Sequence, residues 1–338
     1  MSVRNLDKLF KPRSVAVIGA SPRPGSVGGV VARNLRRARF GGELMLVNPH
    51  HQTIDGLSVH PNVASLPHAP DLAVIVTPPE TVPRLIGELG AFGTRAAVVI
   101  TAGFGELGEE GRSLQRATLE AAKPHLLRIV GPNCVGIMVP RLRLDATFSH
   151  LTAPAGEIAF LSQSGAMITA MLDWAVPRRI GFSHVVSLGD MVDVDFGDML
   201  DYLATDPDTR AILLYLEGVT HGRKFMSAAR AASRTKPVLV LKAGRSAAGA
   251  RAATSHTGVL AGADAVLRCR VSPRRHAAGR DDGRAVRCRR DFGVDARAGW
   301  RPSGDPDEWR RGGRAGHRCI CWLPVVCWPN WRNRRSKS

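Results

Sequence analysis

Short, continuously apolar runs alternate with amphipathic segments along the first part of the chain. SVAVI at 14–18 precedes the turn GASPRPG, and ELMLV at 43–47 precedes NP. Strands of a parallel sheet read as unbroken apolar runs because helices cover both faces. Three more such runs lie at 71–79, 95–104 and 126–133, with helical segments at 27–39, 80–91 and 109–123. The pattern therefore predicts a doubly wound α/β domain.

The same alternation starts again after a proline-bounded segment at 140–154. Four more apolar runs lie at 157–166, 183–190, 211–218 and 237–244, with helical segments at 166–176, 195–205 and 222–234. We therefore expect two α/β domains joined by a linker. The expected divisions are 1–140, 155–267 and a tail at 268–338.

The tail has a different composition from the rest of the chain. Residues 268–338 carry 19 Lys and Arg against 7 Asp and Glu, with five of the six cysteines and five of the six tryptophans. The body keeps only Cys134, as expected in a reducing compartment. Residues 1–11 lack the apolar core of a signal peptide, and no apolar run is long enough to span a bilayer. We expect a cytoplasmic protein without a membrane partner.

Two interpretations of the tail stay open. Arginine-rich segments bind phosphates, which would make it a nucleic-acid arm, although its tryptophans and cysteines are unusual there. Alternatively, the tail is an out-of-frame peptide produced by a single-base frameshift near Leu267. In that case we expect it to be irregular or disordered. For 281–291, synonymous codons can be chosen so that dropping the first base encodes TMDELFDAVE, an amphipathic helix. The same one-base shift lets 304–314 encode AILTNGGGAG. The cysteines of the tail form no C-x-x-C pair, so a zinc module is poorly supported.

Ligands of open α/β sheets bind beyond the carboxyl ends of the strands. The turns there are rich in Gly, Pro, Ser and Thr, which lets backbone N–H groups approach a phosphate, although such turns need these residues anyway. A dinucleotide fingerprint requires a short glycine turn and an acid that binds the ribose. Here Gly19 is followed by a longer insert with two prolines, and the second strand ends in Asn48 and Pro49. A nicotinamide cofactor is therefore not expected.

The ordered motifs LFKPRSVAVIGASPRPGSVGG, VNP, VTPP, ITAGFGE and GPNCVGI resemble the CoA-binding domain of NDP-forming acyl-CoA synthetases. This superfamily includes ADP-forming acetate–CoA ligases and the α-subunit of succinyl-CoA synthetase. FLSQSGA, YLEG and the SHTG loop resemble its second domain. The resemblance covers residues 6–267 and implies a Rossmann-like CoA-binding domain followed by a flavodoxin-like domain.

The resemblance also implies where CoA binds. Positions that match the family's CoA-binding loops lie at five successive strand ends: Gly19, Ala20, Ser21, Pro22, Val27, Asn48, Pro49, Thr77, Pro78, Thr101, Ala102, Gly103 and Asn133. Arg23 lies in the first of these loops and suits a CoA phosphate, or it is a solvated turn arginine.

His256 lies in a Gly-, Ala- and Ser-rich stretch directly after an apolar run. A phosphoryl-carrying histidine needs a carboxylate at its second ring nitrogen, and Glu217 ends the apolar run at 211–218, on the same edge as this loop. The resemblance implies that His256 is phosphorylated, that Glu217 orients it, and that Ser164 and Gly165 cradle the phosphate. A lone loop histidine is otherwise simply solvated. The acids between 190 and 201 favour a helix N-terminus over a metal site, and no metal is expected there.

The expected activity converts acid, CoA and ATP to acyl-CoA, ADP and phosphate, through an acyl phosphate and a phosphohistidine. The partners implied are CoA, a small carboxylic acid, and an ATP-grasp domain or β-subunit that would bind ATP/ADP with Mg and lies outside this chain. An oligomer is expected, and no specific nucleic acid. A non-catalytic CoA-binding regulatory module is the alternative, and an arginine-tailed nucleic-acid binder is a third.

Overall fold

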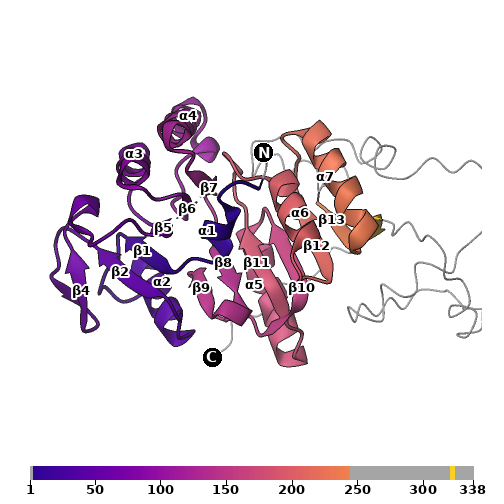
Figure 1. Cartoon of the computed structure of the whole chain (residues 1–338), viewed down its shortest axis with the longest axis horizontal. Coiled ribbons are helices and arrows are strands. Elements are labelled where there is room, and N and C mark those ends of the chain that lie inside the picture. Colours follow the sequence, from indigo (N-terminus) through magenta and orange to yellow (C-terminus); the bar gives the residue numbers. More distant parts are fainter. Residues whose placement is uncertain (1–2, 244–319, 324–338) are drawn as a thin grey trace, which may run out of the picture.

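Two sheets lie side by side in the computed structural model, which describes residues 3–243 and 320–323 (Figure 1). The first sheet has the order β3-β4-β2-β1-β5-β6-β7, and all its pairs are parallel except β3 with β4. Its strands are β1 (Ser14–Ile18), β2 (Glu43–Val47), β3 (Thr53–Ile54), β4 (Leu57–His60), β5 (Leu72–Ile75), β6 (Ala96–Val99) and β7 (Arg128–Val130). The expected Rossmann-like arrangement is confirmed.

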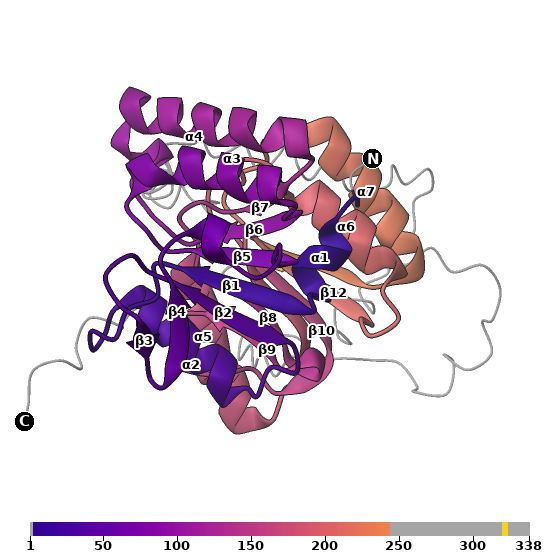
Figure 2. The ribbon, with the colours of Figure 1, turned by 60° about the vertical axis from the view of Figure 1, so that its left-hand side comes forward.

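Helices cover both faces of this sheet. Figure 2 shows α3 (Val82–Phe92) and α4 (Glu109–Ala122) on one face and α2 (Val27–Arg37) on the other. Every residue of β1, β5 and β6 is buried. That burial explains why these strands read as unbroken apolar runs.

The second sheet has the order β14-β13-β12-β10-β11-β8-β9. Its parallel centre consists of β10 (Ala155–Ser162), β11 (Phe182–Ser187), β12 (Ala211–Leu216) and β13 (Val238–Lys242). Helix α5 (Gly165–Ala175) packs in one core cluster, and α6 (Phe196–Thr205) and α7 (Gly222–Thr235) pack in another. This is the flavodoxin-like layer expected from the sequence.

Two strands in this sheet were not expected. The segment 140–154, interpreted as a linker, contains β9 (Leu144–Thr147), which pairs antiparallel with β8 (Gly136–Val139). Strand β8 pairs with β11, so residues 136–147 belong to the second sheet. Both strands have only four residues, and a proline turn separates them, so neither run stood out as a strand.

Part of the tail also differs from the expectation of irregular structure. Residues Ile320–Leu323 form β14, which pairs parallel with β13. An apolar run of four residues suits the edge of a sheet, since that edge offers unpaired backbone groups. The remaining residues of the tail lie outside the described part.

Helix α1 (Leu6–Phe10) joins the two sheets. Its Leu6, Leu9 and Phe10 are fully buried in the cluster that also holds α6 and α7. The Phe10 ring meets the edge of His184 from β11 with the centroids 5.1 Å apart. Burial lowers the pKa of His184 to about 4, so this imidazole is neutral at pH 7. The two sheets thus share one apolar core.

The acidic segment before α6 forms a helix cap, as its sequence suggested. The Asp195 carboxylate accepts hydrogen bonds from Gly197 N at 2.8 Å and Asp198 N at 3.1 Å. Such a cap satisfies N–H groups that have no acceptor within the helix. Across the described residues, no helix combines the length and hydropathy needed to cross a membrane.

Candidate functional site

The carboxyl ends of the strands from both sheets open onto one cleft of about 1080 Å3. Its lining includes the β5 and β6 ends of the first sheet and the β10 and β12 ends of the second. Ten of the predicted site residues line it: Arg23, Val27, Thr77, Pro78, Thr101, Ala102, Asn133, Ser164, Gly165 and Glu217. The fold therefore brings together motifs that are almost 200 residues apart in the sequence.

The turn after β1 is built for close backbone approach. Gly19 has φ +94°, and a Cβ on Gly28 would lie 2.1 Å from the Gly19 carbonyl oxygen. Only glycine at position 28 therefore allows α2 to pack this closely against the turn. Ser26 caps α2 through its Oγ, which accepts from Gly29 N at 3.3 Å. Val27 follows at the first helical position and is 40% exposed toward the cleft.

Several predicted CoA contacts support the loops without lining the cleft. The Asn48 amide donates to Ala20 O at 2.6 Å and accepts from His50 N at 2.8 Å, which ties the first two turns together. The predicted residues that do not line the cleft are Gly19, Ala20, Ser21, Pro22, Asn48, Pro49 and Gly103. Their contact with CoA stays a prediction.

The third and fourth strand ends are tied in a similar way. Thr101 Oγ1 donates to Thr77 O at 2.7 Å, and this hydrogen bond links the two turns. Both residues line the cleft. Asn133, at the fifth strand end, has a left-handed backbone with φ 57°.

The SQSG turn joins β10 to α5 and presents the start of that helix to the cleft. Ser162 Oγ accepts from Ser164 N at 3.1 Å and donates to Ser164 O at 2.8 Å, which closes the turn. The first N–H groups of a helix have no acceptor within it, so they suit an anion. A Cβ on Gly165 would lie 2.7 Å from Val135 Cγ2, so glycine lets this helix start pack closely against Val135. Phosphate binding by Ser164 and Gly165 stays a prediction.

Glu217 directly follows β12 and is only 9% exposed. Its backbone carbonyl accepts from the buried Lys242 Nζ at 2.9 Å, and the same ammonium donates to Ala243 O at 2.6 Å. Lys242 thus holds the ends of β12 and β13 together at the point where the chain leads toward His256. His256 itself lies outside the described residues.

Asp190, which the sequence assigned to a helix N-terminus with the other acids of 190–201, lies in the cleft instead, because α6 begins only at Phe196. Asp190 Oδ2 accepts from Gln115 Nε2 of α4 at 2.7 Å, and Oδ1 lies 3.5 Å from Asn133 Nδ2. Burial, and then the charge of Glu106, raise the pKa of Asp190 to about 6. The position of Asp190 just beyond a strand end was a usable signal. Gln115 lies within a helix and gave none.

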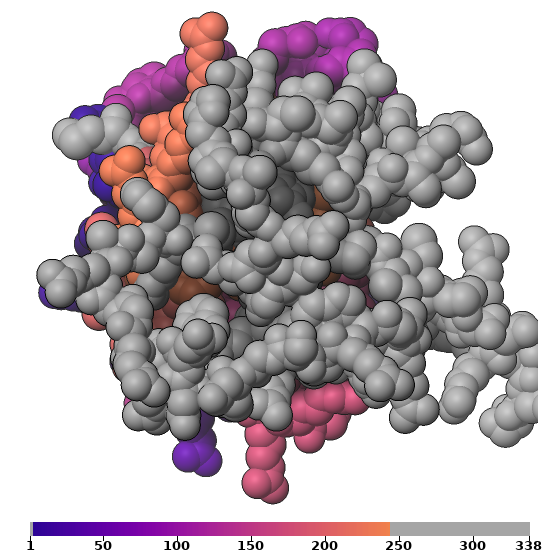
Figure 3. All heavy atoms as spheres, turned by 90° about the vertical axis from the view of Figure 1, so that its right-hand side faces the viewer, coloured from indigo at the N-terminus to yellow at the C-terminus, as the bar shows by residue number. Residues whose placement is uncertain are grey.

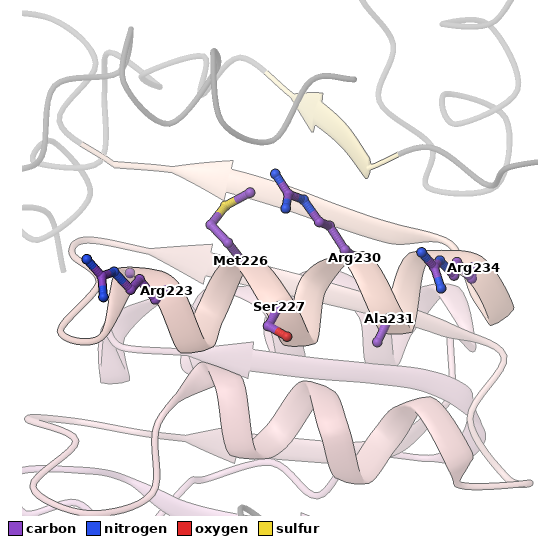
Figure 4. A pocket seen from close by; sticks show the side chains of 7 residues that line it. Arg223, Met226, Ser227, Arg230, Ala231 and Arg234 are labelled. Carbon is purple, nitrogen blue, oxygen red and sulfur yellow. The ribbon is translucent and has the colours of Figure 1, made fainter. Parts of the chain in front are cut away.

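A second hollow, of about 610 Å3, runs along α7. Figure 3 views the molecule from the side on which α7 lies, in orange. Arg223, Arg230 and Arg234 line this hollow, and Figure 4 shows them along the helix with Met226 and Ser227. No strand end contributes to it, and none of the predicted site residues lies in it. The cleft between the sheets is therefore the candidate site.

The two sheets and the cleft at their strand ends define a two-domain α/β protein. The family described as a CoA binding domain matches residues 13–140. The family described as a succinyl-CoA ligase like flavodoxin domain matches residues 155–272. The chain belongs to the NDP-forming acyl-CoA synthetase superfamily.

Similar proteins include ADP-forming acetate–CoA ligases, which agrees with this assignment. The chain is 48% identical over 257 residues to an ADP-forming acetate–CoA ligase I of Archaeoglobus fulgidus, covering 76% of this chain and 37% of the relative. It is 43% identical to the α-subunit of acetate–CoA ligase [ADP-forming] I of Pyrococcus furiosus, covering 78% and 58%. The chain therefore spans between about a third and three fifths of the length of these relatives.

A solved structure resembles the chain closely. It is the dinucleotide forming acetyl-coenzyme A synthetase 1 of Ca. Korarchaeum cryptofilum, in complex with phosphate and ADP. The TM-score is 0.75 at 40% identity, over 78% of this chain and 57% of that one. The expected superfamily and fold are thus confirmed by sequence and by structure.

Proposed function

We propose that this chain forms the CoA-binding and phosphohistidine-bearing part of an ADP-forming acyl-CoA synthetase. One observation carries the proposal: a single cleft joins the turns predicted to bind CoA, the SQSG turn and Glu217. In the proposed reaction the CoA thiol and the phosphoryl acceptor would meet in this cleft, and such positioning lowers the entropic cost of the transfer. The relatives named as acetate–CoA ligases support the reaction class.

Three transfers make up the proposed reaction. His256 takes a phosphoryl group from ATP, with one N–P bond formed and one O–P bond broken as ADP leaves. The acid's carboxylate then attacks phosphorus, so the N–P bond breaks and an acyl phosphate forms. Finally, the CoA thiol loses its proton and attacks the acyl carbon, and inorganic phosphate leaves with the bonding electrons.

The residues have separate roles in this scheme. Ser164 and Gly165 form the start of α5, whose backbone N–H groups from Gly165 onward stabilise phosphate charge, because a helix start favours anions. The N–H of Ser164 itself donates to Ser162 Oγ. Glu217 accepts from one ring nitrogen of His256, so that the other nitrogen is free to attack. Glycine at positions 19 and 28 keeps the first turn close enough for backbone contact with CoA phosphates.

A nucleotide-binding partner completes the proposal. An ATP-grasp domain or β-subunit would bind ATP with Mg and deliver the phosphoryl group to His256. The name of the Pyrococcus furiosus relative, a subunit α, supports a separate partner chain. We place the assembly in the cytoplasm as an oligomer that uses a small carboxylic acid.

The reading-frame hypothesis remains a proposal as well. The flavodoxin-like family match ends at residue 272, close to Leu267, where the hydrophobic pattern stops. Sequencing the gene tests this idea. A coding sequence whose other frames contain no ligase-like segment after codon 267 contradicts it.

Labelling with acetyl [32P]phosphate tests the proposed function on the full chain. We expect acid-labile label on the wild type and none on His256→Ala. His150→Ala, an exposed histidine paired with Asp173 at 2.8 Å, is the matched control and should label normally. Label that persists in His256→Ala contradicts the proposal. CoA binding by calorimetry without any label favours a regulatory CoA-binding module instead.

A further inference from the structure

The backbone holds Asp190 at the point where the two sheets meet beside the cleft. Asp190 follows β11, and Leu188 N donates to Ser162 O at 2.8 Å, which joins the ends of β11 and β10. Asp190 N donates to Pro132 O at 3.0 Å, so the same segment also contacts the turn after β7. A Cβ on Gly189 would lie 2.1 Å from that carbonyl oxygen, so this contact requires glycine. Asp190 therefore borders both halves of the candidate site.

The carboxylate of Asp190 is bound to the first sheet and lines the cleft. Its Oδ2 accepts from Gln115 Nε2 at 2.7 Å, its Oδ1 lies 3.5 Å from Asn133 Nδ2, and the backbone of Gly105 also donates to it. Asn133 N in turn donates to Thr101 O at 2.9 Å, within the turns predicted to bind CoA. A carboxylate has about four acceptor sites, so these three donors leave room for one more.

The charges around Asp190 keep this carboxyl basic. Burial, and then the charge of Glu106, raise the pKa of Asp190 to about 6. Arg112 also lines the cleft, but its guanidinium is paired with Glu109 at 2.9 Å. Burial raises the pKa of the neighbouring Cys134 thiol to about 12, so that group is neutral. A carboxyl that titrates near pH 6 is ionised at pH 7 and still accepts protons well enough for base catalysis.

We propose that the Asp190 carboxylate is the general base that accepts the proton of the CoA thiol during acyl transfer. This inference rests on the proposed function, which supplies the thiol and the acyl phosphate. The S–H bond breaks, and the proton forms an O–H bond with the carboxylate. The sulfur electrons form the bond to the acyl carbon, and phosphate leaves with the electrons of its C–O bond. Water then takes the proton from Asp190 and restores the carboxylate.

Asp190→Asn removes the base and changes little else in the shape of the side chain. The amide still offers a carbonyl oxygen to Gln115, but it takes up no proton at neutral pH. The assay follows acetyl-CoA formation from acetyl phosphate and CoA by the full chain, a reaction that needs no ATP. We expect kcat at pH 8 to fall at least about 100-fold, the contribution of a positioned base, while KM for CoA stays close to the wild-type value.

The pH profile separates a base from a group that only positions the turns. Wild-type kcat should decrease as the pH falls through about 6, because protonation removes the base. The residual kcat of Asp190→Asn should lack this decrease. Asp208→Asn makes the same substitution before β12, at the opposite end of the strand from the cleft, where its carboxylate pairs with Arg141 at 3.1 Å. This control should keep the wild-type rate and profile.

Thermal melts followed by circular dichroism verify that both variants fold. Two outcomes overturn the inference: a wild-type kcat in Asp190→Asn, or a reduced kcat that keeps the wild-type pH profile. In either case His256 still takes label from acetyl phosphate if the proposed function is correct. A wild type that neither labels His256 nor forms acetyl-CoA refutes the proposed function and this inference together.

Discussion

Arg128 forms ion pairs that connect the two sheets, and replacing it should lower the free energy of unfolding. Its Nε lies 2.8 Å from Asp193 Oδ2, and its Nη2 lies 3.3 Å from Asp198 Oδ2. The side chains of Arg128 and Asp198 are 13% and 1% exposed. Arg128 belongs to β7, whereas both acids follow β11 in the chain, so the contact crosses the boundary between the sheets.

The loss of stability expected for Arg128→Ala depends on which partners its two carboxylates retain. Removing one partner of a fully buried ion pair costs about 3–5 kcal/mol. Here Asp198 retains Lys224 Nζ at 2.6 Å, and Asp193 retains Ile129 N at 2.9 Å. Neither carboxylate is left unpaired, so we expect a smaller loss of about 2–3 kcal/mol in the free energy of unfolding, equal to one or two charge-assisted hydrogen bonds.

Urea denaturation followed by circular dichroism measures this loss. Arg84→Ala removes an arginine from an exposed pair with Glu88 on α3 and serves as the control, with an expected change below about 0.5 kcal/mol. A double-mutant cycle with Asp193→Asn isolates the contact across the boundary. If Arg128→Ala costs no more than the control, the contact does not stabilise the arrangement of the sheets and the reasoning is refuted.

Two further predictions concern the cleft. Gly28→Ala should abolish CoA binding measured by calorimetry, because its Cβ would meet the Gly19 carbonyl oxygen at 2.1 Å; unchanged affinity would show that the turn adapts. Burial raises the pKa of Asp190 to about 6 from 3.8, so the folded state binds its proton more tightly than the unfolded state. The contribution of Asp190 to the stability of the folded state should therefore decrease between about pH 4 and pH 6, and Asp190→Asn should gain about 1–3 kcal/mol at pH 8 and little at pH 4. Melting curves at the two pH values that show equal gains would contradict this assignment.

The sequence alone determined the parallel strands and the turns that follow them. Runs such as 14–18 and 72–75 are apolar throughout because helices cover both faces of the sheet, and Gly, Pro or Ser ends them wherever the chain must turn. The order of the glycine-rich turns also identified the superfamily, because each turn carries a local backbone requirement. These properties depend on neighbouring residues and can be read one segment at a time.

Only the tertiary structure decided which of these turns share a cleft. The contacts of Gln163 with Glu217 and of Asp190 with Gln115 join residues that are 54 and 75 positions apart, and no local pattern encodes such pairs. The same holds for β8, whose four residues could have continued the first sheet but pair with β11 instead. Long-range pairing depends on the packing of the whole chain around one core. The sequence of a short segment therefore does not determine which distant segment it pairs with.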